Sequence, residues 1–209
     1  MNIVLIGAPL SGKGTLSKLL SNHYQIPHIS MGDLLRSAVK SETKFSSYIE
    51  NHIRAGTLIN DDLVKVILEH RLSKPDCKNG FILDGYPRNI NQANTLDSIC
   101  KVDKVVYATV SYVTLIKRLS SRLVCPNCQS VYNADTYKEI FCEKCKKKLE
   151  RRPDDNEEIM LKRVKDFNQT SIPILRKYMD EKKLVSISNE GSIDGVFNEL
   201  LGKLGLWFI

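Results

Sequence analysis

A glycine-rich stretch near the N-terminus carries the clearest chemical signal in the chain, in the sequence Gly7-Ala8-Pro9-Leu10-Ser11-Gly12-Lys13-Gly14-Thr15. An apolar run of strand length precedes it, and leucines at helical spacing follow it. Glycines let backbone N–H groups turn toward one point, and the N-terminal end of the following helix adds partial positive charge there. With the full charge of Lys13, the stretch predicts a phosphate-binding loop rather than an ordinary glycine-rich turn.

An acidic residue, Asp84, ends a second apolar strand, and the chain then turns at Gly85 and Pro87 before it reaches Arg88. Ligands bind at the carboxyl ends of strands in parallel α/β sheets. A carboxylate at that position in a protein with a phosphate-binding loop suits the organisation of Mg²⁺. The alternative role for Asp84 is to cap a helix or a turn.

Four of the six cysteines form two Cys-x-x-Cys pairs that are separated by thirteen residues. Each pair offers two thiolates to one ion, and two pairs give the tetrahedral set that zinc prefers. The predicted ligands are Cys125, Cys128, Cys142 and Cys145. Because protein would occupy all four positions, we expect a structural metal, and the alternative is disulfides, which a reducing cytoplasm disfavours. The remaining Cys77 and Cys100 fit small apolar residues that are buried or half-buried.

Arginines at helical spacing are further candidates for binding an anion. Arg118 and Arg122, four residues apart, would share one helix face, where an anionic ligand would offset their repulsion and solvent exposure is the alternative. Arg36 and Arg54 lie in a small helical segment over residues 30–59. For Arg54, exposure to solvent is the preferred interpretation.

Strands and helices alternate along the chain. Apolar runs predict strands over residues 2–7, 25–29, 80–84, 104–110 and 184–188. A long helix is expected from about residue 156, carrying Arg163, and Pro173 is expected to break or kink it. A small β unit is expected between the cysteine pairs. The alternation predicts an α/β fold in which helices cover both faces of a parallel sheet.

The composition narrows the class of protein. A chain of 209 residues with 42% hydrophobic residues fits one domain with small insertions. It contains neither an apolar run long enough to span a membrane nor a segment typical of a signal peptide, so we expect a cytoplasmic protein. The net charge of +7 suits either nucleic-acid binding or a nucleotide site lined by arginines. Because aromatic and basic residues are not interleaved, nucleic acid is the less favoured partner.

Together these motifs resemble the adenylate kinase family in its long form, which has a zinc-bearing lid. The resemblance runs essentially from end to end. It rests on residues 7–15, Ser30-x-Gly32-Asp33-x-x-Arg36, Asp84-Gly85-Tyr86-Pro87-Arg88 with Gln92, Arg118-x-x-x-Arg122, the four cysteines, and Arg152-x-Asp154-Asp155 with Arg163.

The resemblance implies a P-loop NTPase-like fold: a five-stranded parallel sheet with helices on both faces, a helical insertion and a small zinc-stapled lid. Residues 1–29, 60–121 and 157–209 would form the core domain that binds nucleotide. Residues 30–59 would form the AMP-binding insertion, and residues 122–156 the zinc-binding lid. A monomer is expected.

The resemblance also implies an activity, the reversible, Mg²⁺-dependent transfer of the ATP γ-phosphoryl group to AMP, which gives two ADP. ATP would be held by Gly12, Lys13, Gly14, Thr15 and Arg118. AMP would be held by Met31, Arg36, Gly85, Arg88, Gln92, Arg152 and Arg163. The catalytic set would be Lys13, Asp84 (through the waters of Mg²⁺), Arg88, Arg122, Arg152 and Arg163.

A site rich in arginine suits this chemistry, because a phosphate monoester is mostly dianionic at neutral pH and needs no general base. His23, His28, His52 and His70 lie in no motif and receive no role.

Two departures from the family pattern concern the substrates. Leu10 stands where a third loop glycine is usual, and Met31 stands where the family has a threonine associated with the AMP pocket. Two alternatives stay open. One is a nucleoside monophosphate kinase for another acceptor, UMP, CMP or GMP. The other is a zinc-knuckle ATPase that binds nucleic acid.

Overall fold

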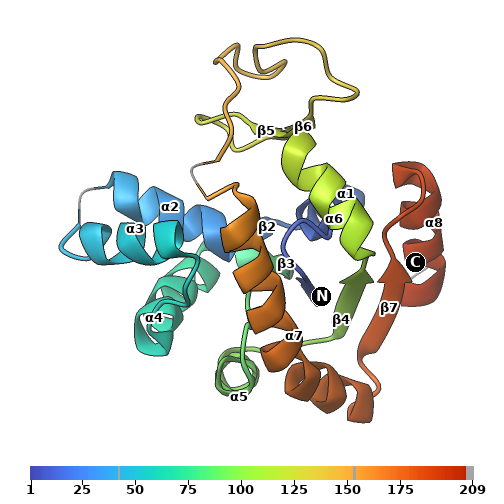
Figure 1. Cartoon of the computed structure of the whole chain (residues 1–209). Helices are drawn as coiled ribbons and strands as arrows, with labels where there is room; N and C mark the ends of the chain where they lie inside the picture. The colour runs from blue at the N-terminus through green and yellow to red at the C-terminus, as the bar shows by residue number, and fades with distance from the viewer. Residues whose placement is uncertain (42, 153, 206–209) are drawn as a thin grey trace.

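The computed structural model describes residues 1–41, 43–152 and 154–205, which fold around a five-stranded sheet (Figure 1). The strands follow the order β2-β3-β1-β4-β7, and each neighbouring pair is parallel. They are β1 (Asn2–Gly7), β2 (His28–Ser30), β3 (Phe81–Asp84), β4 (Lys104–Thr109) and β7 (Leu184–Ser188). The predicted five-stranded parallel sheet is confirmed.

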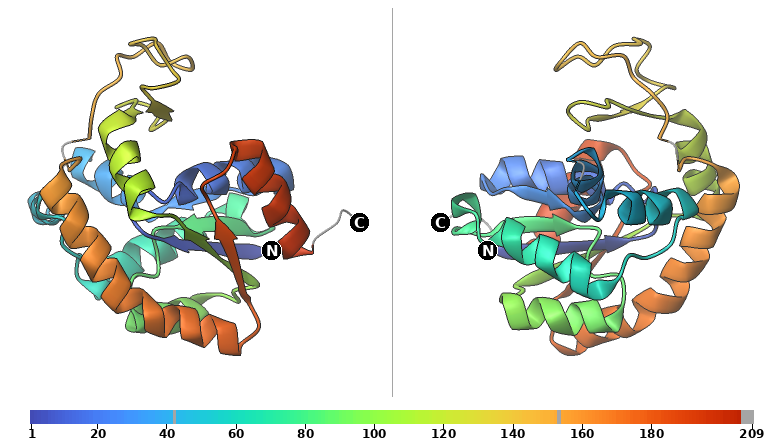
Figure 2. Two further views of the ribbon diagram at one scale, coloured as in Figure 1. Left: turned by 45° about the vertical axis from the view of Figure 1, so that its right-hand side comes forward. Right: turned by 90° about the vertical axis from the view of Figure 1, so that its left-hand side faces the viewer.

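Helices connect the strands and cover both faces of the sheet, as the sequence predicted (Figure 2). The described helices are α1 (Lys13–Tyr24), α2 (Met31–Lys40), α3 (Ser46–Ala55), α4 (Asp61–Leu72), α5 (Ile90–Ile99), α6 (Tyr112–Ser121), α7 (Glu157–Asp180) and α8 (Ile193–Leu204), with a 3-10 turn at Pro75–Cys77.

The side chains of β1 divide the core into two halves. Ile3 and Leu5 belong to a cluster with residues of α1 and α8, whereas Val4 and Ile6 belong to a second cluster with residues of α2 to α5 and α7. None of the four is more than 4% exposed. A strand that is buried on both faces is apolar at every position, which explains the unbroken apolar run before the glycine-rich loop.

The helix that carries Arg118 ends one residue earlier than expected, and this overturns one prediction. The hydroxyl groups of Ser120 and Ser121 both donate to the carbonyl of Lys117, and the chain then becomes extended. Arg122 therefore begins strand β5 (Arg122–Val124). It does not share a helix face with Arg118, and the prediction of a common face is wrong.

The longest helix, α7, contains Pro173 and continues past it, so of the two predicted outcomes, a break or a kink, the break did not occur. Proline lacks the N–H group that would bind the carbonyl four residues earlier. Pro173 is exposed, and α7 follows a curved path around the molecule (Figure 2). Ile174 and Tyr178 lie just beyond it and are buried in the core, so packing holds the helix together across the missing hydrogen bond.

A small β unit, which we call the cysteine unit (residues 122–150), projects from the core at the end of α6 (Figure 1). Its strands β5 and β6 (Val131–Asn133) are antiparallel, and its own core contains Cys125, Cys142 and Leu149. Two lysines of the main body contact it: Lys40 Nζ donates to the carbonyl of Pro126 at 2.8 Å, and Lys18 Nζ to that of Gln129 at 3.4 Å.

Within the described ranges, none of the helices combines the length and the apolar character needed to cross a membrane.

The close approach of the N-terminus to β3 gives a stability prediction. Gly80 has φ +117°, and a Cβ there would lie 2.1 Å from the carbonyl oxygen of Met1. Because both the backbone angle and the backbone contact forbid a side chain, Gly80→Ala should lower the free energy of unfolding by about 3 kcal/mol or more in urea titrations.

The matched control is Gly202→Ala in α8, where a Cβ would meet no described atom within 4 Å. Helix propensity should there raise stability by about 1 kcal/mol. Equal effects of the two substitutions would contradict this account of Gly80.

Candidate active site

The candidate site lies where strands β1, β2 and β3 end. The glycine-rich loop follows β1, and Asp84, the last residue of β3, pairs in register with Leu5 of β1 and Ser30 of β2. Because parallel strands bring their carboxyl ends to one edge, the sheet collects these separate motifs in one place. The sequence predicted this convergence.

The glycine-rich loop is held from outside by two side chains. Asn189 Nδ2 donates to the carbonyl of Ser11 at 2.6 Å, and Arg118 Nη1 donates to the carbonyl of Leu10 at 3.1 Å. Arg118 and Asn189 also contact each other, because Arg118 Nη2 donates to the backbone carbonyl of Asn189 at 2.6 Å. Carbonyls of the loop are thus bound by the protein, which favours a conformation in which its N–H groups serve a ligand.

Asn189 is a residue that the sequence analysis missed. It is 8% exposed and directly follows β7, at the same sheet edge as the other strand ends. The signal that could have identified Asn189 is its position as a polar residue directly after an apolar strand. A Cβ on Gly12 would lie 2.3 Å from Asn189 Nδ2, so Gly12, with φ +80°, is required both by its backbone angle and by this contact.

Leu10 has a left-handed backbone with φ +66°. This is a conformation that glycine adopts at no cost and that other residues adopt at a cost of about 1–2 kcal/mol. Leu10 stands where the family has a glycine, and a less free backbone was expected there. The left-handed conformation of Leu10 shows this effect as backbone strain.

Lys13 begins α1 directly after the loop, and its Nζ donates to the carbonyl of Ala8 at 3.3 Å. Burial and the nearby arginines lower its pKa to about 8, against the opposing effect of Asp84. Because burial is the largest cause of this shift, an anion bound at this position would favour the charged form of the lysine.

Asp84 is 8% exposed, and its Oδ1 has no hydrogen-bond partner among the described residues. Burial acts to raise its pKa, but His28 and the charge of Lys13 outweigh burial and lower it, so the carboxylate is ionised. An unpartnered buried carboxylate oxygen beside a phosphate-binding loop fits a role in holding a hydrated Mg²⁺.

His28, whose Nε2 lies 3.8 Å from Asp84 Oδ2, is a second residue that the sequence analysis missed. It lies on β2, two residues before the strand end, and pairs with Ile82, two residues before Asp84. Only the pairing register brings the two side chains together, so the sequence contained no local signal for their contact.

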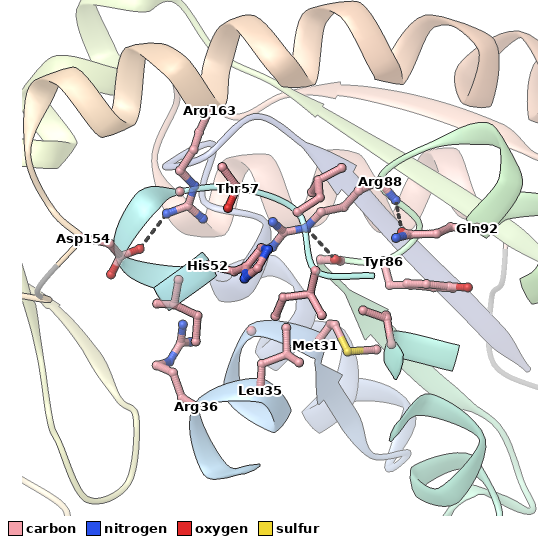
Figure 3. A pocket seen from close by; sticks show the side chains of 17 residues that line it. Met31, Leu35, Arg36, His52, Thr57, Tyr86, Arg88, Gln92, Asp154 and Arg163 are labelled. Atoms are coloured by element: carbon pink, nitrogen blue, oxygen red, sulfur yellow. Dashed lines mark hydrogen bonds and ion pairs between the residues drawn. The ribbon is translucent and has the colours of Figure 1, made fainter. Parts of the chain in front are cut away.

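The first of two cavities contains about 590 Å³ and lies between α2, α3 and the loop after β3 (Figure 3). Arg36, Arg88 and Arg163 reach into its walls from three separate segments. Arg88 Nε donates to the carbonyl of Gly85 at 2.9 Å, and Arg163 Nη1 to Asp154 at 2.6 Å.

Apolar side chains and one amide line the other side of this cavity. Met31, 2% exposed, lies there with Leu35, Ile59 and Val64. Gln92, from the first turn of α5, also lines the cavity. A flat apolar group with polar edges, such as a nucleobase, would fit the combination of apolar walls and a single buried amide. His52, to which no role was given, is a further lining residue.

The second cavity contains about 660 Å³ and lies between the glycine-rich loop and α7, with Pro9 and Lys13 in its wall. The two cavities share five residues, Gly56, Leu58, Gly85, Arg88 and Arg163. Two adjoining cavities that share two arginines could hold two anionic molecules end to end, with the arginines between them.

Arg122 and Arg152 are two more predicted residues of the positive cluster. Arg122 is paired with Asp155, and Arg36 with Asp33. Arg152 has a buried Nε without a described partner. Burial and mutual repulsion lower the pKa values of Arg122 and Arg152.

Two of the residues predicted to bind ATP, Arg118 and Thr15, line neither cavity. Arg118 binds the loop's carbonyls instead of lining either cavity, and Thr15 is exposed. Arg54 is exposed and paired with Glu50, as the sequence favoured.

The four paired cysteines come together in the cysteine unit, with all four sulfur atoms within 4.8 Å of one another. Burial opposes ionisation of Cys142, but hydrogen bonds from Tyr132 and from backbone N–H groups outweigh it and lower the pKa of this thiol to about 6. Four sulfur ligands, at least one of them readily ionised, could hold a tetrahedral metal ion. Cys77 is buried and Cys100 half-buried, as predicted.

Comparisons with known proteins agree with this geometry. Residues 5–183 match the protein family described as Adenylate kinase. A protein named Adenylate kinase from Thermosipho melanesiensis is 39% identical, over 96% of this chain and 98% of the relative. Proteins of the same name from Pseudothermotoga lettingae and Chlamydia caviae are each 41% identical, over 91% and 95% of this chain and 91% and 94% of the relatives.

Proposed function

The chain belongs to the adenylate kinase family, and we propose how its own residues transfer the γ-phosphoryl group of ATP to AMP. The reaction is a reversible phosphotransfer that gives two ADP. The observation that carries the proposal is the pair of adjoining cavities that share Arg88 and Arg163. Neither alternative, another acceptor base or a nucleic-acid-binding ATPase, gains support from the arrangement of the site.

ATP lies with its phosphates on the glycine-rich loop, where Lys13 borders the second cavity. Lys13 and the N–H groups of Gly12, Gly14 and Thr15 bind these phosphates, because they lie at the positive end of α1. Arg118 contacts the donor nucleotide from its position against the glycine-rich loop. The support for this role is its pair of hydrogen bonds to the carbonyls of Leu10 and Asn189.

AMP occupies the first cavity. Its base lies among the apolar residues with Met31 and meets Gln92, beside the backbone of Gly85. Its phosphate lies toward the arginines at the other end, Arg36, Arg88, Arg152 and Arg163. The support is that apolar residues and three arginines together line this cavity.

Transfer depends on charge neutralisation and alignment more than on covalent chemistry with the protein. Arg88 and Arg163, at the junction of the cavities, bind the phosphoryl group as it moves from ATP to AMP, and Arg122 and Arg152 neutralise charge beside them. The AMP phosphate attacks as a dianion, so no histidine has to remove a proton.

Asp84, whose Oδ1 has no partner among the described residues, would hold the hydrated Mg²⁺ that accompanies ATP. When bound, the ion neutralises phosphate charge. His28 and Lys13 keep Asp84 ionised for this task.

We propose three functional parts: a core of residues 1–29, 60–121 and 157–209, an AMP-binding insertion of 30–59, and a lid of 122–156. Closure of the two smaller parts over the core would exclude water, which otherwise competes as phosphoryl acceptor. Contacts that support such closure are Lys40 to Pro126 between insertion and lid, and Lys162 Nζ to the carbonyl of Ala55 at 3.3 Å.

We further propose that the lid binds one structural Zn²⁺ through Cys125, Cys128, Cys142 and Cys145, and that the enzyme is a cytoplasmic monomer without affinity for nucleic acid. Free thiols at metal-ligand spacing suit a reducing compartment. Four basic residues, Lys13, Arg36, Arg88 and Arg163, line the two cavities, where nucleotide phosphates would pair with them.

Replacement of Arg88 tests the proposed transfer site. Arg88→Ala should lower kcat/KM for ADP formation from ATP and AMP by about 100-fold or more, because a donor to the moving phosphoryl group is lost. Arg54→Ala is the matched control: it removes an exposed arginine of the insertion and should change kcat/KM by no more than about twofold. Similar rates for both variants and the wild-type enzyme would remove Arg88 from the site.

Metal analysis tests the proposed lid. The purified chain should contain about one zinc, and a chelator should lower its melting temperature, because metal binding contributes to folding. Cys142→Ser should abolish the bound zinc, whereas Cys100→Ser should retain it. A melting temperature that responds to reductant but not to chelator would indicate disulfides instead.

A further inference from the structure

Both polar atoms of the Gln92 side-chain amide form hydrogen bonds within the protein. Its Oε1 accepts a hydrogen bond from the backbone N–H of Arg88 at 2.7 Å, and its Nε2 donates to Asp61 Oδ1 at 2.6 Å (Figure 3 shows the bond to Arg88). An amide oxygen has two lone pairs and an amide nitrogen has two N–H groups. Gln92 therefore has one acceptor and one donor left for a ligand in the first cavity.

The two partners fix which way the amide points. A backbone N–H can only donate, so it requires the oxygen of Gln92, and a carboxylate can only accept, so it requires the nitrogen. Turning the amide over would place two donors together at Arg88 and two acceptors together at Asp61. Because Gln92 is only 3% exposed, water could not restore these bonds.

Asp61 is itself held in place. Asn89 Nδ2 lies 3.1 Å from Asp61 Oδ2 and 3.3 Å from Oδ1, and the carboxylate belongs to the first turn of α4, where the helix end favours negative charge. Asn89 also caps α5 by accepting the backbone N–H of Gln92 at 2.8 Å. Asp61 and Asn89 thus tie α4 to the residue that faces the cavity.

A fixed amide distinguishes purine bases by their edges. Adenine presents an amino donor beside a ring-nitrogen acceptor, which matches the free acceptor and donor of Gln92. A 6-oxopurine such as hypoxanthine or guanine presents the reverse order, an oxygen acceptor beside an N–H donor. It would be matched only if the amide turned over.

We propose that Asp61 is a positioning residue that makes the acceptor site select adenine over 6-oxopurines, by fixing the orientation of the Gln92 amide. The inference rests on the proposed function, in which Gln92 meets the base of AMP. Asp61 lines neither cavity among the described residues, and it acts through Gln92.

The test compares AMP with inosine monophosphate, whose base differs from adenine at the edge in question. Asp61→Asn keeps the shape of the side chain, but the new amide can either accept or donate, so position 61 no longer opposes turning of the Gln92 amide and only the backbone N–H of Arg88 still does. The ratio of kcat/KM for AMP to that for inosine monophosphate should fall by about tenfold, the effect expected when one charge-assisted constraint is lost.

Asp62→Asn is the matched control, because it removes a neighbouring exposed carboxylate from the same helix turn. It should leave the ratio unchanged. Asn89→Ser retains a side chain that caps α5 but lacks the donor to Asp61, and it should lower the ratio in the same direction by less.

An unchanged ratio in folded Asp61→Asn and Asn89→Ser enzymes that still use AMP would overturn this inference alone. An equal fall in Asp62→Asn would also overturn it, because a general loss of negative charge would then be the cause. A wild-type enzyme that fails to phosphorylate AMP would overturn the proposed function itself, together with the inference.

Discussion

Repulsion between basic side chains held close together is the constraint on which the site depends. The cluster contains six basic residues, Lys13, Arg36, Arg88, Arg122, Arg152 and Arg163, and four carboxylates, Asp33, Asp84, Asp154 and Asp155. Asp166, which lines the second cavity, is a fifth carboxylate, so one positive charge remains uncompensated in a partly buried region, where charges without partners cost free energy. Nucleotide phosphates can provide the missing negative charge, so the surplus favours binding of the substrates.

The fold keeps these basic residues close together because they belong to separate elements, each of which is stabilised on its own. Asp84 ends β3, and Lys13 begins α1 after the loop that follows β1; both strands are buried on both faces. Arg163 lies on α7, whose packing withstands an internal proline, and Arg88 is fixed by the carbonyl of Gly85 and by Gln92. In the proposed assignment, the same bond between Arg88 and Gln92 links the phosphate end of the acceptor cavity to its base end. Phosphate binding and base selection therefore share one short loop.

The sequence predicted what depends on local pattern. The apolar run before Gly7, the acid at the end of a strand and the paired cysteines each have a short-range signal, so the parallel sheet, the loop and the sulfur cluster were expected. It could not predict contacts that only tertiary pairing creates. His28 meets Asp84 through strand register, Asn189 reaches Ser11 across 178 positions, and Asp61 reaches Gln92 from another helix. The error at Arg122 and the continuation of α7 past Pro173 have the same origin, because side-chain bonds and packing overrode local propensity.

The most direct test of the central claim is a measurement of the products formed from ATP and Mg²⁺ with AMP, CMP, UMP, GMP or no acceptor. If the shared arginines serve transfer between two nucleotides, ADP should form with AMP as acceptor, with two ADP formed for each AMP consumed. Little product should form when the acceptor is omitted, because water is a poor substitute in a site built for two phosphates. Preferred transfer to another monophosphate would contradict the assignment of the acceptor cavity to adenine. ADP formed equally well without any acceptor would contradict the account of a two-substrate transfer site.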